Sequence, residues 1–190
     1  MGFGLLFLGY FFMFNFPYRG FDIFPDFLGF VINVFAFRRL AEYKMGFEVL
    51  KKYNWLMLFS SVVLAALQLT GLVSEPLPVT GYYELVYLGL TFFYHFYLLA
   101  SIYRLATDAG SLTVAAQAKR NLTLSFIYVF FALFNALPFG FVTELIERLN
   151  KYGYGIGIYI LRCIWLLFNL TLIYSAYMRI APEGEEQEGE

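Results

Sequence analysis

The stretch that decides the fold class is E-L-V-Y-L-G-L-T-F-F-Y-H-F-Y-L-L-A-S-I-Y, residues Glu84–Tyr103. After its first residue it contains no Asp, Glu, Lys or Arg. A helix that crosses a bilayer core of about 30 Å needs about 20 predominantly apolar residues. The stretch has that length, so it predicts a membrane-spanning helix.

The rest of the chain repeats this pattern. Hydrophobic residues make up 61% of the 190 residues and charged residues 14%, which leaves little chain for a soluble domain. The sequence predicts an all-α polytopic membrane helix bundle of six transmembrane segments. The first two segments are short and form an N-terminal helical hairpin. Cutting the chain at its charged stretches gives these segments as Gly2–Asn15, Phe24–Phe37, Asn54–Val73, Glu84–Tyr103, Leu122–Val142 and Tyr154–Met178.

Residues 1–181 are predicted to form a single transmembrane domain. The tail Pro182–Glu190 reads P-E-G-E-E-Q-E-G-E and is too acidic and polar to pack, so it is expected to be disordered. The net charge of -1 gives no indication of nucleic-acid binding. The single cysteine, Cys163, can form neither an intrachain disulfide nor a metal cluster. We therefore expect no cofactor and no bound metal.

The basic residues are distributed unevenly between the two sides of the predicted bundle. Lys and Arg favour the cytoplasmic side of short loops. This asymmetry predicts a multi-pass protein of the cell membrane with both termini in the cytoplasm. Nine basic residues lie on one side, Arg38, Arg39, Lys44, Lys51, Lys52, Arg104, Lys119, Arg120 and Arg179, and three lie on the other, Arg19, Arg148 and Lys151.

The segment Arg38–Tyr53 has helical periodicity as well as basic charge. Leu40, Tyr43, Phe47 and Leu50 recur at spacings of three and four residues. This pattern predicts a basic amphipathic helix that lies on the anionic inner leaflet of the bilayer. Docking of a membrane or cytoplasmic protein partner is the alternative interpretation.

The connection between the first two segments carries a recognisable motif. Residues Phe21–Gly29 read F-D-I-F-P-D-F-L-G. This stretch resembles the F-D-I-L-P-D-F-I-G motif near the N-terminus of small multi-pass membrane proteins of Gram-positive bacteria. The resemblance covers about the first fifth of the chain and implies a membrane topology, not an activity. We expect Asp22 and Asp26 to be hydrogen-bonded, with Asp26 at the start of the second helix.

Polar residues recur at helical spacing inside the apolar segments. Ionisable side chains within a membrane are costly and usually face the bundle interior or a water-filled cavity. Arg162 in particular needs an acidic partner, such as Asp26 or Glu84, or an anionic ligand. Placing each residue by its depth predicts one outward-facing ligand-binding cluster of Asp22, Asp26, Gln68, Glu84, His95, Asn135 and Arg162.

The same polar residues have a structural interpretation. Asn, Gln and His often form hydrogen bonds between membrane helices, each contributing about 1 kcal/mol. The sequence contains no zinc-protease, nucleophile-elbow or phosphate-loop motif, so we expect no catalytic residues and no enzyme activity.

Two functions therefore remain open for the predicted bundle. The first is small-solute binding or transport, on its own or as a subunit of a larger transporter. Its layout resembles the substrate-capture subunits of energy-coupling-factor vitamin importers, although Gly2, Gly4 and Gly9 do not reproduce the A-x-x-x-A pattern of their first helix. The second is a structural or regulatory membrane subunit whose polar residues hold the helices together.

Overall fold

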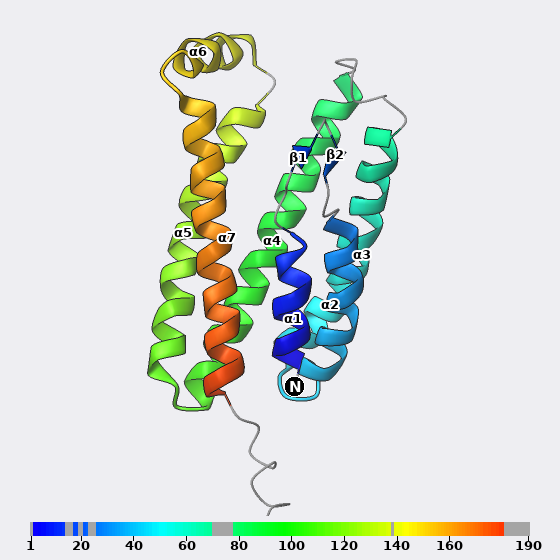
Figure 1. The fold of residues 1–190 in the computed structure, drawn as a ribbon, viewed down its shortest axis with the longest axis vertical. Helices are drawn as coiled ribbons and strands as arrows, with labels where there is room; N and C mark the ends of the chain where they lie inside the picture. The colour runs from blue at the N-terminus through cyan, green and yellow to red at the C-terminus, as the bar shows by residue number, and fades with distance from the viewer. Residues whose placement is uncertain are drawn as a thin grey trace, which may run out of the picture.

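The computed structural model describes residues 2–13, 17–18, 21–22, 26–69, 78–137 and 139–180. These residues form seven helices and a pair of two-residue strands (Figure 1). The fold class is therefore all-α, as predicted. The elements are α1 (Gly2–Phe11), β1 (Pro17–Tyr18), β2 (Phe21–Asp22), α2 (Asp26–Leu40), α3 (Met45–Leu69), α4 (Pro78–Asp108), α5 (Leu112–Ala136), α6 (Gly140–Asn150) and α7 (Tyr154–Arg179).

Six of these helices close a ring. Helices α1 to α5 each pack against the next in chain order, α5 packs against α7, and α7 packs against α1. The helices alternate in direction, so α1 begins and α7 ends at the same end of the bundle (Figure 1). The ring encloses an interior filled largely by aromatic side chains, among them Tyr10, Tyr94 and Trp165.

Small residues bring α1 and α2 into close contact. Gly2 and Gly9 are seven residues apart on α1, and they face Ala36 and Gly29, which are seven residues apart on α2. A Cβ atom built on Gly9 would lie 2.8 Å from the Gly29 carbonyl oxygen, and one on Gly2 would lie 2.7 Å from the Ala36 carbonyl oxygen. Close backbone approach of this kind is typical of helix pairs packed in membranes.

Fewer of the described helices meet the requirements for a membrane span than the six that the sequence predicted. Two of them, Leu85–Asp108 within α4 and Tyr154–Arg179, are long and apolar enough to cross a membrane. A third span results if α5 and α6 are counted together, so the described residues give two or three spans instead of six. Helices α1 and α2 have 10 and 15 residues, fewer than the roughly 20 that a span requires. Helix α3 has 25 residues, but Glu48, Lys51 and Lys52 lie in its first two turns.

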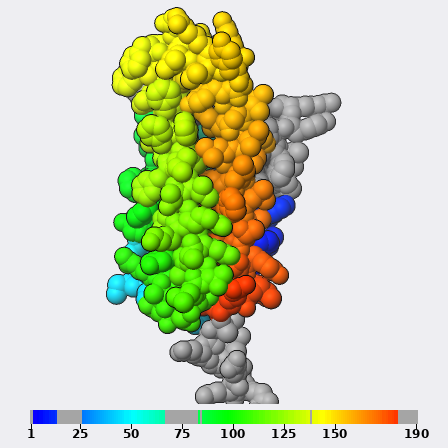
Figure 2. Space-filling view, turned by 90° about the vertical axis from the view of Figure 1, so that its left-hand side faces the viewer, coloured from blue at the N-terminus to red at the C-terminus, as the bar shows by residue number. Residues whose placement is uncertain are grey.

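Helix α6 is an element that the sequence did not predict. Helix α5 ends at Ala136, two residues before Pro138, and α6 follows at an angle of 111° to it. Proline and glycine both disfavour a continuous helix, and Pro138 and Gly140 stand where the predicted segment Leu122–Val142 is interrupted. Helix α6 lies across the ends of α5 and α7, which run side by side down one face of the molecule (Figures 1 and 2).

The segment Arg38–Tyr53 does not form a separate amphipathic helix. Residues Arg38–Leu40 end α2, and α3 begins at Met45 and continues into the bundle. The prediction of a helix lying on the bilayer surface is therefore wrong. The reason is that the apolar face of this segment, including Phe47 and Leu50, is buried in the core of the bundle and not left for lipid.

Charged side chains form ion pairs at the end of the bundle where α2 ends and α3 begins. Lys44, in the turn before α3, forms an ion pair with Asp108 at the end of α4. Lys51 and Glu48 form a second pair at 2.8 Å, and the hydrogen bond from Lys51 lowers the pKa of Glu48. Because these pairs are exposed, each contributes little to stability. The nine basic residues predicted to lie on one side are all near this end of the bundle. They lie at the ends of α2, α4 and α7, in the turn before α3 and near the starts of α3 and α5.

Candidate functional site

A hydrogen-bonded layer joins three helices in the half of the ring nearer the basic end. Asn169 of α7 donates a hydrogen bond to the Tyr10 hydroxyl of α1 at 2.9 Å. Asn121 of α5 donates to the Asn169 side-chain oxygen at 3.1 Å and to the Phe168 carbonyl oxygen at 2.7 Å. All three polar side chains are buried. These bonds satisfy groups that would be costly to leave unpaired, so they are a structural connection.

A second layer joins α2, α3 and α4. Asn33 donates to the Tyr94 hydroxyl at 3.1 Å, and that hydroxyl donates to the Asn54 side-chain oxygen at 3.2 Å. Asn54 in turn donates to the Phe30 carbonyl oxygen at 2.9 Å. Each of these side chains is buried, and the chain of bonds fixes the register of three neighbouring helices.

His95 lies in the ring interior next to both layers. Its side chain is 2% exposed, and its imidazole contacts the rings of Tyr10, Tyr94 and Trp165 at centroid distances of 5.4, 5.4 and 4.5 Å. Its Nδ1 atom lies 2.7 Å from the Thr91 carbonyl oxygen. A carbonyl oxygen can only accept, so Nδ1 carries the proton and Nε2 of the neutral ring presents a lone pair.

This Nε2 atom is the unexplained feature of the interior. It is buried and has no hydrogen-bond partner among the residues that the structure describes. Leaving a buried acceptor unpaired costs about 1–3 kcal/mol. A second acceptor that the described residues leave unpaired, the Asn33 side-chain oxygen, is packed against Gly9 where α1 and α2 meet. Nε2 of His95 is therefore the interior acceptor better suited to a donor from a bound molecule.

Opposite charges lie further along the interior, toward the α6 end. Asp26 opens α2, as predicted, and its Oδ2 atom accepts a hydrogen bond from the Tyr87 hydroxyl of α4 at 3.0 Å. The positive charge of Arg162 on α7 lies close enough to Tyr87 and Tyr128 to act on both electrostatically. It also acts on His95, and the Asp26 charge acts on the same two tyrosines. Arg162 is half-buried, in keeping with a position at the inner surface of the ring.

Aromatic rings connect these charges to His95. Tyr128 of α5 stacks on Trp165 at a centroid distance of 4.7 Å and an interplanar angle of 18°. Trp165 also contacts His95 and donates a hydrogen bond to Ser125 at 2.7 Å, which fixes the orientation of its ring. We call the resulting group the interior cluster, and it consists of Asp26, Tyr87, His95, Tyr128, Arg162 and Trp165.

The interior cluster includes three of the predicted site residues. Asp26, His95 and Arg162 come from three different helices. The charges of Asp26 and Arg162 act on the same two tyrosines, and His95 is connected to Tyr128 through Trp165. Asn135 is exposed near the end of α5 and is not part of the cluster. The side chains of the other predicted residues, Asp22, Gln68 and Glu84, lie outside the described part of the structure.

Sequence reasoning left Tyr87, Tyr128 and Trp165 out of the site. Tyr87 lies one helical turn before Thr91 and two turns before His95, on the same face of α4. This spacing was the available signal. Tyr128 lies seven residues before Asn135, so helical spacing was a signal for it as well. Trp165 carries no such signal, because tryptophan is also common at membrane interfaces. Among the described residues, no group of His, Cys, Asp or Glu side chains is arranged to hold a metal ion.

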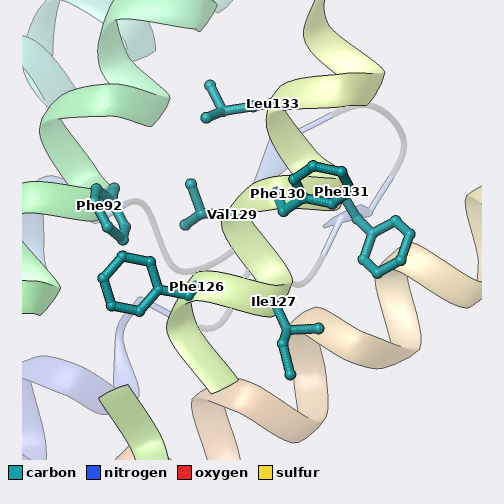
Figure 3. Close-up of a pocket in the computed structure, with 7 residues that line it drawn as sticks. All are labelled: Phe92, Phe126, Ile127, Val129, Phe130, Phe131 and Leu133. Carbon is teal, nitrogen blue, oxygen red and sulfur yellow. The ribbon is translucent and has the colours of Figure 1, made fainter. Parts of the chain in front are cut away.

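A separate hollow lies between α4 and α5. It has a volume of about 580 Å³, and the side chains around it are all apolar (Figure 3). Phe92 of α4 and Phe126 of α5 are in edge-to-face contact beside it, with ring centroids 5.4 Å apart. We call it the α4–α5 groove, and it is lined by Phe92, Phe126, Ile127, Val129, Phe130, Phe131 and Leu133.

Comparison with known proteins gives no further assignment. No protein-family model, curated protein or solved structure matches this chain. The resemblance of Phe21–Gly29 to Gram-positive membrane proteins therefore stays a prediction. The function has to be argued from the interior cluster itself.

Proposed function

We propose that this chain is an integral membrane protein that binds a small solute in the interior of its helix ring, for uptake or transport across the cell membrane. The observation that carries this proposal is the buried Nε2 atom of His95, which has no hydrogen-bond partner in the described part of the chain and lies in the same interior as the Arg162 charge. A bound solute would supply a hydrogen-bond donor to Nε2 and a negative group to Arg162. The protein acts by binding and not by catalysis, and it needs no cofactor.

The interior cluster favours a particular kind of solute. Arg162 offers a guanidinium for a carboxylate or phosphate, which it binds well because its donors match their geometry. The stacked rings of Trp165 and Tyr128 make the surroundings apolar and aromatic. The solute we expect is therefore small, anionic at one end and able to donate a hydrogen bond at the other. Asp26 would favour a solute that also carries a positive or hydrogen-bond-donating group.

The proposed orientation follows the basic residues. With the basic end in the cytoplasm, the start of α1 and the end of α7 lie inside, and α6 lies at the outer surface. The short helices α1 and α2 would be embedded as a hairpin against the longer ones, so that six helices contribute to the membrane domain. Arg162, close to the outer start of α7, then places the site in the outer half of the bilayer. The basic segment Arg38–Tyr53 is the surface where a membrane or cytoplasmic partner would dock.

A structural or regulatory subunit is the second candidate. It is supported by the layer of Tyr10, Asn121 and Asn169, in which polar groups of three helices satisfy one another. In that case the interior cluster would serve only to hold helices together, and Arg162 would pair permanently with a carboxylate.

Thermal unfolding of the purified protein separates the two candidates. The probes are a panel of small carboxylates, phosphates and sulfonates, each with a neutral analogue, tested on the wild type and on Arg162→Met. A solute present at 100 times its Kd should stabilise the wild type by about 2.7 kcal/mol. We expect the same solute to have no effect on a folded Arg162→Met variant. Arg179→Met, which removes an exposed arginine at the opposite end of the bundle, is the matched control and should respond like the wild type.

Two outcomes would contradict the solute-binding proposal. One is a solute that stabilises the wild type and Arg162→Met equally, because Arg162 would then not contact it. The other is a wild type that responds to no member of the panel together with an Arg162→Met variant that loses most of its stability. That combination would favour the structural subunit, since removing one partner of a buried ion pair is strongly destabilising.

A further inference from the structure

The α4–α5 groove lies on the outside of the ring, away from the interior cluster. Phe126 and Phe130 line it and are 54% and 67% exposed. Tyr128, which lies between them in sequence, is buried and faces the interior. Because successive residues of a helix point in different directions, the groove and the solute site occupy opposite faces of α5. In a membrane, the groove therefore opens toward lipid.

Basic residues lie at one end of this groove. Lys119 is seven residues before Phe126, which places it on the same face of α5 and about 10 Å closer to the basic end. Arg104 lies near the end of the neighbouring helix α4. Both side chains are exposed, and neither takes part in an ion pair with another described residue.

The spacing of charge and groove matches the dimensions of a lipid. Leu133 lies at the far end of the groove, 14 residues after Lys119, which is about 21 Å along the helix. One leaflet of a bilayer with a hydrocarbon core of about 30 Å is about 15 Å deep. An acyl chain that starts at a headgroup beside Lys119 therefore runs past Phe126 and into the groove.

We propose that the α4–α5 groove binds one acyl chain of an anionic phospholipid, whose headgroup phosphate contacts Lys119 and Arg104. The lining is wholly apolar and suits a hydrocarbon chain, while the two cations select the headgroup charge. A second copy of this chain fits less well. Two copies in one membrane share an orientation, so pairing through a two-fold axis along the membrane normal would bring the same basic ends together.

Native mass spectrometry of the detergent-purified full chain tests this proposal. The protein is offered equal amounts of phosphatidylglycerol and phosphatidylcholine with identical acyl chains. We expect one phosphatidylglycerol to be retained preferentially. The preference should fall about fivefold in Lys119→Gln, and again in Lys119→Gln with Arg104→Gln, since a basic residue near the surface contributes about that factor to the binding of anionic lipid.

Two further variants test the groove itself. Leu133→Trp fills the end of the groove and should reduce retention of both lipids. Ile164→Trp adds the same side chain to an exposed position on α7 outside the groove and should have no effect. Lys151→Gln, at the opposite end of the bundle, is the charge control.

Three results would overturn the proposal. The first is equal retention of the two lipids by the wild type. The second is retention that none of the groove or charge variants changes. The third is a wild-type dimer that Leu133→Trp converts to a monomer, because the groove would then be an interface between copies. Lys119→Gln and Arg104→Gln change exposed positions and should fold normally. They therefore still test the proposal if Leu133→Trp fails to fold.

Discussion

At the scale of single residues, the interior of the ring contains two kinds of polar group. Asn169 and Asn121 bond to each other and to neighbouring helices, and their hydrogen-bonding capacity is used in holding the fold. Within residues 2–180 as far as the structure describes them, His95 bonds through Nδ1 alone, and its Nε2 atom is buried without a partner. A group left unpaired at a cost in stability is a better indication of function than one that is fully satisfied.

His95→Phe should separate stability from function. Phenylalanine keeps an aromatic ring beside Tyr10, Tyr94 and Trp165 and removes the unpaired nitrogen. We expect the free energy of unfolding to rise by about 1 kcal/mol and solute binding to be lost. Thermal unfolding with and without the stabilising solute measures both. His95→Ala is the comparison, because it should leave a cavity and destabilise the protein by about 3 kcal/mol. If His95→Phe destabilised the protein about as much as His95→Ala does, Nε2 would have a partner in the native state.

The sequence indicated some of these residues and not others, for physical reasons. His95 and Arg162 stand out because ionisable groups are rare and costly in apolar segments. Trp165 does not stand out in a chain with 24 Phe, 16 Tyr and two Trp residues, since aromatic side chains also face lipid. Asn135 has the spacing of an interior residue, but it lies near the end of α5, where the helix is exposed.

At the scale of elements, hydrophobic length predicted where helices occur better than it predicted where they end. Each of the six apolar segments contains or overlaps a helix of the ring. Helix α3, however, begins at Met45 and not near Asn54, because its charged first turns still bury Phe47 and Leu50. Helix α6 was not predicted, because most of its 11 residues lie beyond Val142, where the predicted apolar segment ends and charged residues begin. Sequence periodicity alone does not reveal which neighbour covers a helix face.

The contact between α1 and α2 gives a prediction for glycine. A Cβ atom on Gly9 would collide with the Asn33 side chain and approach the Gly29 carbonyl oxygen, so Gly9→Ala should destabilise the protein by about 2 kcal/mol. Gly157→Ala on α7 is the matched control, because a Cβ atom there meets no other atom within 4 Å. It should stabilise the protein by about 0.5–1 kcal/mol through the helix preference of alanine. Thermal unfolding of the two variants compares them directly. Equal tolerance of both substitutions would show that α1 and α2 do not approach each other closely.

At the scale of the whole molecule, orientation and ring closure determine where the site lies. The basic residues gather at the end where α1 begins and α7 ends, and α6 lies at the other end. If the basic end is cytoplasmic, the interior cluster is in the outer half of the membrane. A solute would then reach it from outside the cell.

Cysteine labelling in intact cells tests this orientation. In a Cys163→Ser background, a membrane-impermeant maleimide should label Tyr152→Cys, next to α6, and should not label Met45→Cys, at the basic end. Both positions are highly exposed in the structure, so accessibility from outside decides the result. Labelling of both positions after the membrane is permeabilised is the control. The reverse pattern in intact cells would place the interior cluster near the cytoplasm.

The central claim is that α7 packs against α1 and closes the ring, since without this contact Arg162 and His95 would not share an interior. A Cβ atom on Gly4 would lie 3.6 Å from the ring of Tyr177, one turn from the contact between Phe7 and Tyr174. Cross-linking of Gly4→Cys with Tyr177→Cys by a short bifunctional maleimide, in a Cys163→Ser background in membranes, measures the contact directly. The ring predicts efficient intramolecular cross-linking of this pair and none when Tyr177→Cys is replaced by Leu167→Cys, an exposed position on α7 about 15 Å further along the helix. Equal cross-linking of both pairs, or of neither, would contradict the closed ring and the solute site inside it.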